Sequence, residues 1–494
     1  MVCIVFTFCV AAVIASPAQT LSTLYSFCSQ ANCADGEYPL GRLVQGTDGN
    51  FYGTTFQQGA AGGGTVYKLT PSGALTTLHS FAGYSDGAQP YAGLIQATDG
   101  NFYGVTTIDG GVGQDVGTVF KITSGGTFTS LHAFAGYPAD GGNPWPPLLQ
   151  ASDGNFYGTT YEGGAPNVGI VFKITAAGSL TIVHTFCTQS GCPDGANPQA
   201  GLVQGSDGNL YGTAVGGGTN GEGTVFKITT SGTLTTLHSF AITDGAAPSG
   251  TLVQASDGNF YGTTYEGGAS NNGTVFAMTP GGTLTTLYSF CSQSGCADGS
   301  SPQGGLVQDT DGTFYGTTYH GGADSIGTIF SLSVGLGPFV KTLPASGKAG
   351  ATVIILGTNL TGATKVSFNG IAAKFTVVSS TEITTTVPTG ATTGSVTVVT
   401  PSGTLKNNVI FNVAPQIKSF TPTSGPVGTT VTITGVSLKQ TTEVTFDGVA
   451  ATAFTVDSAT KVTVMVPAGA NTGTIAITTP GGTATSTASF TVTE

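Results

Sequence analysis

The apolar positions of this chain fall into short runs rich in Val, Ile, Phe, Tyr and Thr, and turns rich in Gly separate the runs. Asp-Gly and Ser-Gly pairs between such runs are typical of tight β-hairpins, because Gly adopts positive φ without steric cost. The stretch 200–240 shows the whole pattern. It predicts four strands over residues 201–204, 209–213, 224–229 and 233–240, with a glycine-rich loop over 216–223.

This four-strand pattern recurs six times. Each copy contains a form of Asp-Gly-Asn-Phe-Tyr-Gly, with Leu210 in place of Phe in the fourth copy and Thr313 in place of Asn in the sixth. A repeat of about 50 residues in an all-β pattern is typical of a β-propeller with one blade per repeat. The copies begin at Asp48, Asp99, Asp153, Asp207, Asp257 and Asp311.

The count of strands predicts how the propeller closes. A fourth-strand pattern ending at Phe27 precedes any first strand, whereas the last repeat, 305–333, has three strands and no fourth. We therefore expect Thr20–Phe27 to complete the last blade. The result is a six-bladed propeller over residues 19–337 with 3+1 strand closure, which leaves no open sheet edge.

The pattern changes after residue 337. Val-x-Phe-x-Gly begins at Val366 and again at Val444, and Val-Pro occurs at Val387 and again at Val466. Short alternating strands over modules of this length predict two small β-sandwiches, over residues 338–414 and 415–494. These motifs resemble the IPT/TIG family of immunoglobulin-like domains. In bacteria that resemblance implies spacer or adhesive modules on exported proteins.

The six-fold repeat resembles the Gloeo-Verruco tandem repeat of exported bacterial proteins. Gly-Leu-Val-Gln, Asp-Gly-Asn-Phe-Tyr-Gly-Thr-Thr and Gly-Thr-Val-Phe-Lys-Ile carry the resemblance over roughly residues 20–333. It implies no defined activity.

Charge excludes some partners. The net charge is −12, and the 13 Lys and Arg residues form no cluster. Nucleic acid and an anionic membrane surface are therefore not expected partners. Some eukaryotic IPT/TIG proteins bind DNA, and the acidic charge argues against that use here.

The first 18 residues are apolar and end in small residues, which predicts a secretory signal peptide over 1–18. A buried first strand is the alternative. No later run reaches the roughly 20 apolar residues needed to span a bilayer. We expect a secreted or cell-surface protein, monomeric, with an extracellular glycan or a surface protein as its partner.

Six cysteines form three pairs at one spacing, and each pair follows a predicted fourth strand. They occur only in the repeats where the following loop is longest, so we expect local disulfides that restrain those loops. Metal binding is a weaker interpretation, because no His lies near the pairs. The pairs are Cys28 and Cys33, Cys187 and Cys192, and Cys291 and Cys296.

Several polar residues recur at one position in every repeat, and recurrence favours a structural role. The glutamines that end the first strands are expected to satisfy backbone groups. The His and Tyr residues of the fourth strands are expected to pack or to form hydrogen bonds rather than to bind a metal together, because outermost strands lie far apart. The aspartates of Asp-Gly-x-x-Pro are expected to cap turns. The alternative is a ring of Ca²⁺ ligands, and Ca²⁺ is the one cofactor that the sequence suggests. These aspartates are Asp35, Asp86, Asp140, Asp194, Asp244 and Asp298.

Departures from the repeat are the better candidates for function. The only Trp of the chain and three loop tyrosines with acidic or His neighbours suit the stacking and hydrogen bonding of sugar rings. Ordinary surface loops are the alternative. The candidates are Trp145, Tyr161, Glu162, Tyr265, Glu266, Tyr319 and His320.

No nucleophile elbow, zinc-protease or P-loop motif appears. We therefore interpret the chain as an exported, non-enzymatic glycan-binding or adhesion protein. The alternatives are a polysaccharide-active enzyme, in which Glu162 and Glu266 would act as a carboxylate pair, and a structural surface protein.

Overall fold

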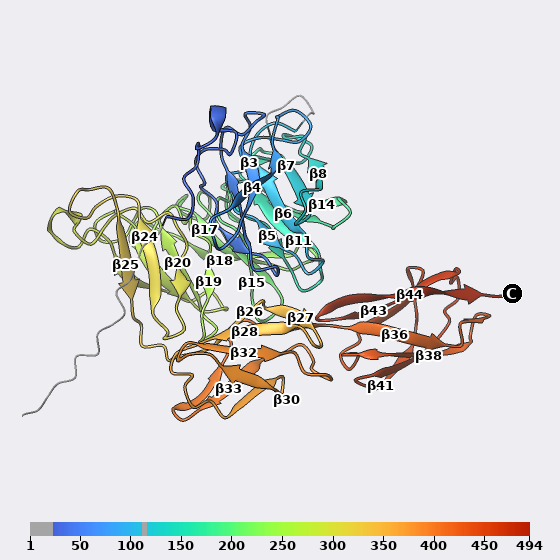
Figure 1. Cartoon of the computed structure of the whole chain (residues 1–494). Coiled ribbons are helices and arrows are strands. Elements are labelled where there is room, and N and C mark those ends of the chain that lie inside the picture. The colour runs from blue at the N-terminus through green and yellow to red at the C-terminus, as the bar shows by residue number, and fades with distance from the viewer. Residues whose placement is uncertain (1–22, 111–115) are drawn as a thin grey trace, which may run out of the picture.

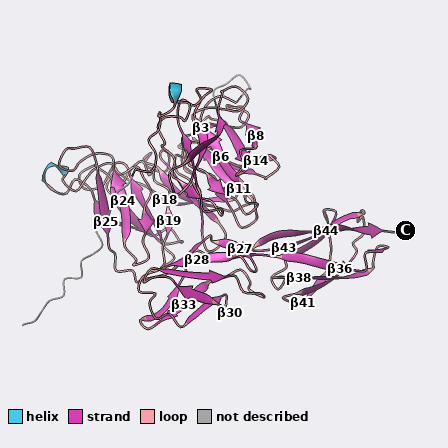
Figure 2. Ribbon diagram, viewed as in Figure 1, coloured by secondary structure: helices cyan, strands magenta, loops and turns pink. Residues whose placement is uncertain are grey.

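A computed structural model describes residues 23–110 and 116–494, and in this part of the chain the secondary structure is almost entirely β (Figures 1 and 2). The helices described there are two 3-10 turns, Ala31–Cys33 and Ser294–Cys296. Both lie in cysteine-containing loops. The predicted signal peptide falls on residues outside the described ones. None of the described helices is long and apolar enough to cross a membrane.

Six repeat sheets make up the first part of the chain, and we call them the first to the sixth sheet in chain order. Each is antiparallel, and its strands lie side by side in chain order. The first sheet contains β1 (Val44–Gln45), β2 (Phe51–Thr55), β3 (Thr65–Leu69) and β4 (Leu75–Ser80), and the second contains β5 (Ile95–Gln96), β6 (Phe102–Thr106), β7 (Thr118–Ile122) and β8 (Phe128–Ala133). The third contains β10 (Leu149–Gln150), β11 (Phe156–Thr160), β13 (Ile170–Ile174) and β14 (Leu180–Thr185), beside a short pair of β9 (Gly141–Gly142) with β12 (Glu162–Gly163).

The later repeats continue the series. The fourth sheet contains β15 (Val203–Gln204), β16 (Leu210–Ala214), β17 (Thr224–Ile228) and β18 (Leu234–Ser239), and the fifth contains β19 (Val253–Gln254), β20 (Phe260–Thr264), β21 (Thr274–Met278) and β22 (Leu284–Ser289). The sixth has three strands in the described residues, β23 (Val307–Gln308), β24 (Phe314–Thr318) and β25 (Thr328–Leu332). The repeated four-strand sheets predicted from the sequence are therefore present.

The Asp-Gly turn of each repeat is tied to the strand that follows it. In the fourth sheet, the Asn209 backbone N–H donates to Asp207 Oδ1 at 3.1 Å, and the Tyr211 hydroxyl donates to Asp207 Oδ2 at 2.9 Å. The Tyr211 side chain is buried, and its burial and this carboxylate both raise the pKa of the phenol. The motif Asp-Gly-Asn-Phe-Tyr thus recurs because it locks a turn.

Consecutive sheets meet through one repeated interface. At four of the five junctions between consecutive sheets, the buried Tyr of one motif stacks on the Phe of the next, as Tyr52 does on Phe102 with centroids 3.9 Å apart. At the junction of the third and fourth sheets, Tyr157 shares an apolar cluster with Leu210. On the turn side, the Thr47 backbone N–H donates to Gln96 Oε1 at 2.9 Å. Equivalent stacks join Tyr103 to Phe156, Tyr211 to Phe260 and Tyr261 to Phe314.

The same interface is not formed between the sixth and first sheets. Tyr315 is 42% exposed, whereas its counterpart Tyr261 is 4% exposed. On the facing side Leu43 is 45% exposed, whereas its counterpart Leu94 is 3% exposed. In the described residues the six sheets therefore form an open series with two unpaired apolar faces.

The predicted pairing of Thr20–Phe27 with the sixth sheet is not formed in the described residues, of which residues 20–22 are not part. Residues 23–27 have no strand assignment, and β25 is an edge strand with Ile329 82% exposed. The segment instead lies on the first sheet, where the ring of Phe27 packs edge-on against Tyr67 at 5.0 Å. That contact reproduces the packing of Phe81 on Phe120 one repeat later.

Two β-sandwiches follow, shown in orange and red in Figure 1. One sheet of the first sandwich contains β26 (Lys341–Leu343), β28 (Thr352–Leu356), β32 (Glu382–Thr386) and β31 (Phe375–Val377). The facing sheet contains β30 (Ile371–Ala373), β29 (Lys365–Phe368), β33 (Val396–Thr400) and β34 (Gly403–Lys406). A short parallel pair is formed by β27 (Ser346–Lys348) and β35 (Asn412–Ala414). One sheet of the second sandwich contains β36 (Gln416–Thr421), β38 (Thr430–Val436), β42 (Lys461–Met465) and β41 (Phe454–Ser458). The facing sheet contains β37 (Ser424–Gly425), β44 (Gly482–Val492), β43 (Gly473–Thr479), β39 (Glu443–Phe446) and β40 (Val449–Ala450). Each sandwich encloses its own apolar core.

The first sandwich docks on the turn side of the fifth and sixth sheets. Thr358 Oγ1 lies 3.0 Å from Thr310 Oγ1, and the Asn408 side-chain amide donates to the Gln254 carbonyl at 3.4 Å. The ammonium of Lys341 donates to the Gln308 carbonyl, and burial lowers the pKa of Lys341 against the opposing effect of Asp309. The opposite side, which carries the long loops, is not involved in these contacts.

Candidate functional site

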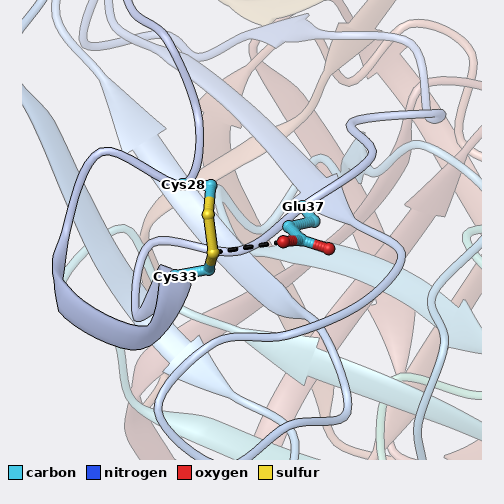
Figure 3. Close-up of side chains that lie close together, drawn as sticks. All are labelled: Cys28, Cys33 and Glu37. Carbon is cyan, nitrogen blue, oxygen red and sulfur yellow. Dashed lines mark hydrogen bonds between the residues drawn. A yellow bond between two sulfur atoms is a disulfide. The ribbon is translucent and has the colours of Figure 1, made fainter.

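The three cysteine pairs form disulfides within their own loops, as predicted. Each joins residues five apart in sequence, with Cα atoms 4.0 Å apart. In the first of them, Glu37 Oε1 lies 3.1 Å from Cys33 Sγ, and Figure 3 shows the Glu37 carboxylate pointing at the disulfide. These three residues are also the one group of three possible metal ligands among the described residues. Disulfide sulfurs are not thiolates, so the group as it stands is a poor metal site.

The recurring aspartates of Asp-Gly-x-x-Pro are engaged in local hydrogen bonds. His184 Nε2 lies 2.8 Å from Asp194 Oδ2, and the Cys187 backbone N–H donates to the same carboxylate. In the fifth loop, Tyr288 and Ser292 donate to Asp298. Burial by itself raises the pKa of Asp298, but these hydrogen bonds outweigh it and lower the pKa to about 2. None of the six aspartates belongs to the group of possible metal ligands found in the described residues.

The recurring His and Tyr residues of the fourth strands are the partners of these aspartates. Four His–Asp pairs lie within 3.1 Å, and Tyr25 and Tyr288 take the place of His in the first and third of the three cysteine loops. Each pair closes its own loop, which is the structural role expected from the sequence. The recurring glutamines likewise join neighbouring turns, as Gln96 does with Thr47.

Trp145 and Tyr161 are brought together by the fold. Their rings stack with centroids 4.7 Å apart and planes 9° apart. Trp145 lies in the segment before β10, between Pro144 and Pro146, and Tyr161 directly follows β11. Both side chains are partly exposed. Two candidates separated by 16 residues therefore form one aromatic unit on the loop side.

The other candidates lie at equivalent places in other sheets. Tyr265 directly follows β20, and Tyr319 follows β24, where its ring contacts His320 at 4.5 Å. Glu162 pairs with Gly142 in β12, and Glu266 forms the equivalent bridge with Ala246. The two glutamates therefore belong to the third and fifth sheets and hold the same local position in each.

The structure adds a second aromatic pair that sequence reasoning missed. The rings of Phe56 and Tyr91 lie edge to face with centroids 6.0 Å apart, and Tyr91 is 51% exposed. Tyr91 follows the Pro of its repeat as Trp145 does, and Phe56 follows the second strand as Tyr161 does. An alignment of the repeats at these loop positions would have identified both residues from the sequence. We call Phe56, Tyr91, Trp145 and Tyr161 the aromatic arc.

The aromatic arc lies close to where consecutive sheets converge. The segments that precede the first strands touch across sheet boundaries, as the Gly201 backbone N–H donates to Thr251 Oγ1 at 3.0 Å. A Cβ built on Gly93 would lie 2.4 Å from the Arg42 carbonyl oxygen, so the first and second sheets also approach closely here. The arc thus lies beside the segments that lead into the first strands, on the loop side.

Comparison with known families agrees with this architecture. The Gloeobacter/Verrucomicrobia repeat matches residues 11–193 and 189–373, which is more than half of the sequence. The chain belongs to this repeat family. Its C-terminal part contains two IPT/TIG domains, matched over residues 339–412 and 415–493. The resemblances inferred from the sequence motifs are therefore confirmed, and no curated protein has a matching sequence.

Solved structures show weaker similarities to this chain. It is 18% identical to a surface glycan-binding protein of Prevotella bryantii, with a TM-score of 0.23 and coverage of 32% of this chain and 40% of that one. It is 24% identical to SGBP-B from a xyloglucan utilization locus of Bacteroides uniformis, with a TM-score of 0.17 and coverage of 31% and 48%. The chain thus spans less than half the length of these proteins.

A third similarity extends over almost the whole chain. A fungal alcohol oxidase of the AA5 family, in complex with copper, is 14% identical, with a TM-score of 0.38 and coverage of 92% of this chain and 98% of that one. TM-scores this low do not establish a shared ligand or activity.

Proposed function

We propose that this protein is an exported, non-enzymatic glycan-binding protein that uses the aromatic arc on the loop side of its repeat sheets. The observation that carries the proposal is the stacked pair of Trp145 and Tyr161 within the third repeat. A second pair forms across the first and second repeats from Phe56 and Tyr91, the residues that align with Tyr161 and Trp145. Partly exposed aromatic rings stack on the apolar faces of sugar rings, and loop hydroxyls and backbone groups supply hydrogen bonds.

Rigid presentation of the rings supports the same conclusion. Three prolines, Pro144, Pro146 and Pro147, flank Trp145, and proline restricts the backbone. A ring held in place loses little entropy when a ligand binds. The scaffold below the arc is rigid as well, because the aromatic interface between consecutive sheets recurs along the series.

Export is supported by the three disulfides, since such bonds persist in oxidising compartments. The first IPT/TIG domain docks on the turn side and leaves the loop side available, which suits a spacer that holds the binding surface outward. We infer a monomer, with ligand contacts confined to the loop side.

Binding without hydrolysis is the inferred mode of action. A glycosidase needs two carboxyl groups about 5–9.5 Å apart across one bond. Glu162 and Glu266 occupy equivalent places in the third and fifth sheets, where each forms a local bridge. This arrangement supports a repeated structural use of the position rather than one shared reaction centre.

We also infer that the six sheets close into a six-bladed propeller. The exposed Tyr315 and the half-buried Phe51 are the two halves of the stack that recurs between the other sheets. Residues 23–26 would pair with β25 in the register that β4 keeps with β3, where Thr65 pairs with Ser80. That register places Ser26 opposite Thr328 and Tyr25 opposite Ile329.

The binding proposal is tested with the mature protein on a glycan array, followed by affinity measurements on the polysaccharides it retains. Saturable binding with no release of reducing ends is the expected result. Reducing ends released in proportion to protein would instead assign polysaccharide hydrolysis. No retained glycan on a broad panel would overturn the proposal.

A further inference from the structure

A cavity of about 360 Å³ lies between the last strands of the third and fourth sheets. Its walls come from β14, from β18 with the turn before it, and from the cysteine-containing loop that follows β14. The volume is at the lower end of the roughly 300–1,000 Å³ that small-molecule sites occupy, so the cavity suits one small ligand. We call it the rim cavity, and its lining includes His184, Thr188, Gln189, Asp194, Leu234 and Thr236.

One wall of the rim cavity differs from its counterpart between the first and second sheets. There, Phe128 stacks on His79 with ring centroids 3.9 Å apart and planes 6° apart. Leu234 begins β18 as Phe128 begins β8. Both Leu234 and His184 line the rim cavity, so at this junction a leucine takes the place of the stacked ring. The space that an aromatic ring fills beside His79 is therefore available to a ligand beside His184.

The loop that lines the rim cavity carries a hydroxyl whose counterparts are already engaged. In the first and third cysteine loops, the serine after the first cysteine donates to the loop aspartate, as Ser292 does to Asp298 at 2.9 Å. Thr188 occupies that position in the second loop, and its hydroxyl makes no hydrogen bond in the part of the chain that the structure describes. Asp194 there accepts from His184 and from a backbone N–H instead. The Thr188 hydroxyl is therefore available to a ligand.

His184 also keeps one ring nitrogen without a partner. Burial raises the pKa of Asp194, but hydrogen bonds from His184 and from the Cys187 backbone N–H outweigh burial and lower the pKa. An ionised carboxylate only accepts hydrogen bonds, so His184 Nε2 is the donor in its 2.8 Å contact with Asp194. In the described residues His184 Nδ1 makes no hydrogen bond. The loop-closing pair thus leaves hydrogen-bonding capacity beside the cavity.

The lining combines the two kinds of surface that bind a sugar. Leu234 and the His184 ring offer surfaces on which the C–H face of a pyranose can pack. Thr188 and Gln189 are exposed, and a hydroxyl and an amide each donate and accept hydrogen bonds, as sugar hydroxyls do. No Lys or Arg is among the described residues that line the cavity, and the Asp194 carboxylate would repel an anionic sugar. The lining therefore favours a neutral sugar.

We propose that the rim cavity binds one neutral sugar residue, which packs on Leu234 and His184 and forms hydrogen bonds with the side chains of the loop after β14. The proposal rests on the proposed glycan-binding function and adds a second contact point to the aromatic arc. One segment connects the two places, because the same loop continues to Asn197, whose side-chain amide donates to the Tyr161 carbonyl at 3.0 Å.

Histidine signals provide a direct test. The chain has five histidines, and four of them pair with loop aspartates in the same way. The full mature protein with isotope-labelled histidine is titrated with the methyl glycosides of glucose, galactose, mannose and xylose, and the ring nitrogen shifts are recorded by NMR. His184→Tyr assigns the His184 signals, because Tyr25 and Tyr288 hold the equivalent positions. His79 is the internal control, since Phe128 covers its ring.

At least one glycoside is expected to shift the His184 signals saturably and to leave the His79 signals unchanged. Leu234→Phe should abolish the His184 shift, because it restores the ring that fills the space beside His79. Leu180→Phe is the matched control and should keep the shift, since Leu180 begins β14 and does not line the rim cavity. A His184 shift that persists in Leu234→Phe would overturn the proposal.

A second variant keeps the test decisive if Leu234→Phe disturbs the fold. Thr188→Ala with Gln189→Ala changes two exposed loop residues and should weaken the affinity read at His184 about fivefold or more, because hydrogen bonds to the sugar are lost. Unchanged affinity in this variant would overturn the proposed contacts. If no glycoside shifts His184 while polysaccharide binding still depends on Trp145, the rim cavity is not a sugar site and the proposed function stands. Absence of all glycan binding would overturn both.

Discussion

Trp145 and Tyr161 stack with planes 9° apart, although they belong to different segments of the third repeat. One face of each ring is therefore turned to the other, and a ligand has access to the faces and edges that remain. If this surface binds a ligand, we expect the two rings to act as one unit, because each restrains the other.

Trp145→Ala is expected to weaken glycan affinity by about 1–3 kcal/mol and to leave the fold intact. Tyr161→Ala should have a smaller effect in the same direction, and the double variant should lose less than the sum of the two, because removal of either ring also disturbs the other. Tyr84→Ala is the matched control, since Tyr84 is 82% exposed and is not part of the arc. Unfolding by Trp145→Ala, or unchanged affinity, would show that the ring serves packing alone.

Tyr265→Ala and Tyr319→Ala test how far the binding surface extends. Tyr319 is 57% exposed and Tyr265 is partly buried, and both occupy the position that Tyr161 has in the third repeat. A long polysaccharide that crosses the loop side should lose affinity in both variants, and a short oligosaccharide should be unaffected. Titration with oligosaccharides of increasing length measures the difference, and length-independent losses would contradict a shared surface.

Closure of the propeller is tested by a disulfide between introduced cysteines. The inferred register predicts that Ser26→Cys and Thr328→Cys in one chain form an intramolecular bond on oxidation. Thr65→Cys with Ser80→Cys is the control, because that pair is adjacent in β3 and β4. A bond between two copies would show that the exposed edge of β25 recruits a second molecule.

Deletion of residues 19–27 addresses the same point by stability. If these residues complete the sixth sheet, their loss should lower the melting temperature by several degrees and promote aggregation, because an edge strand then stays exposed. An unchanged melting temperature would rule out the closure.

The disulfides should stabilise the folded protein mainly by restricting the conformational freedom of their loops. Cys187→Ser with Cys192→Ser is expected to lower the free energy of unfolding by about 2 kcal/mol, which is the chain-entropy value for a loop this short. Non-reducing peptide mapping should recover the three local bonds. Cross-linked peptides from different repeats would contradict the local assignment.

Acid should weaken the fold through the loop aspartates. The pKa of Asp298 is lowered from 3.8 to about 2 in the folded protein, so its contribution is fully present above pH 3.8 and is lost as the pH falls toward 2. Asp298→Asn should lower stability at neutral pH and flatten this acid dependence. Thermal unfolding measured between pH 2 and pH 7 provides the comparison, and an identical slope in the variant would exclude the carboxylate as a cause.

The repeat architecture could be predicted from the sequence because each repeat carries its own local determinants. Asp207, Asn209 and Tyr211 lie within five residues and bind one another, so the turn and the following strand are encoded together. The same is true of Cys187 and Cys192, whose short separation allowed the disulfide to be predicted. Side chains that recur at one position of several repeats favoured a structural role, and His184 and Asp194 form a local hydrogen bond.

The contacts between repeats could not be predicted from the sequence, because they depend on the tertiary structure. The approach of Arg42 to Gly93 and of Phe56 to Tyr91 depends on how the first two sheets meet, and no local pattern in the chain records that distance. The exposure of Tyr315 and Leu43 also depends on the tertiary structure, because closure of the series depends on the twist accumulated over six sheets. Local hydrogen bonds thus determine each repeat, whereas the geometry between repeats determines which side chains share a surface.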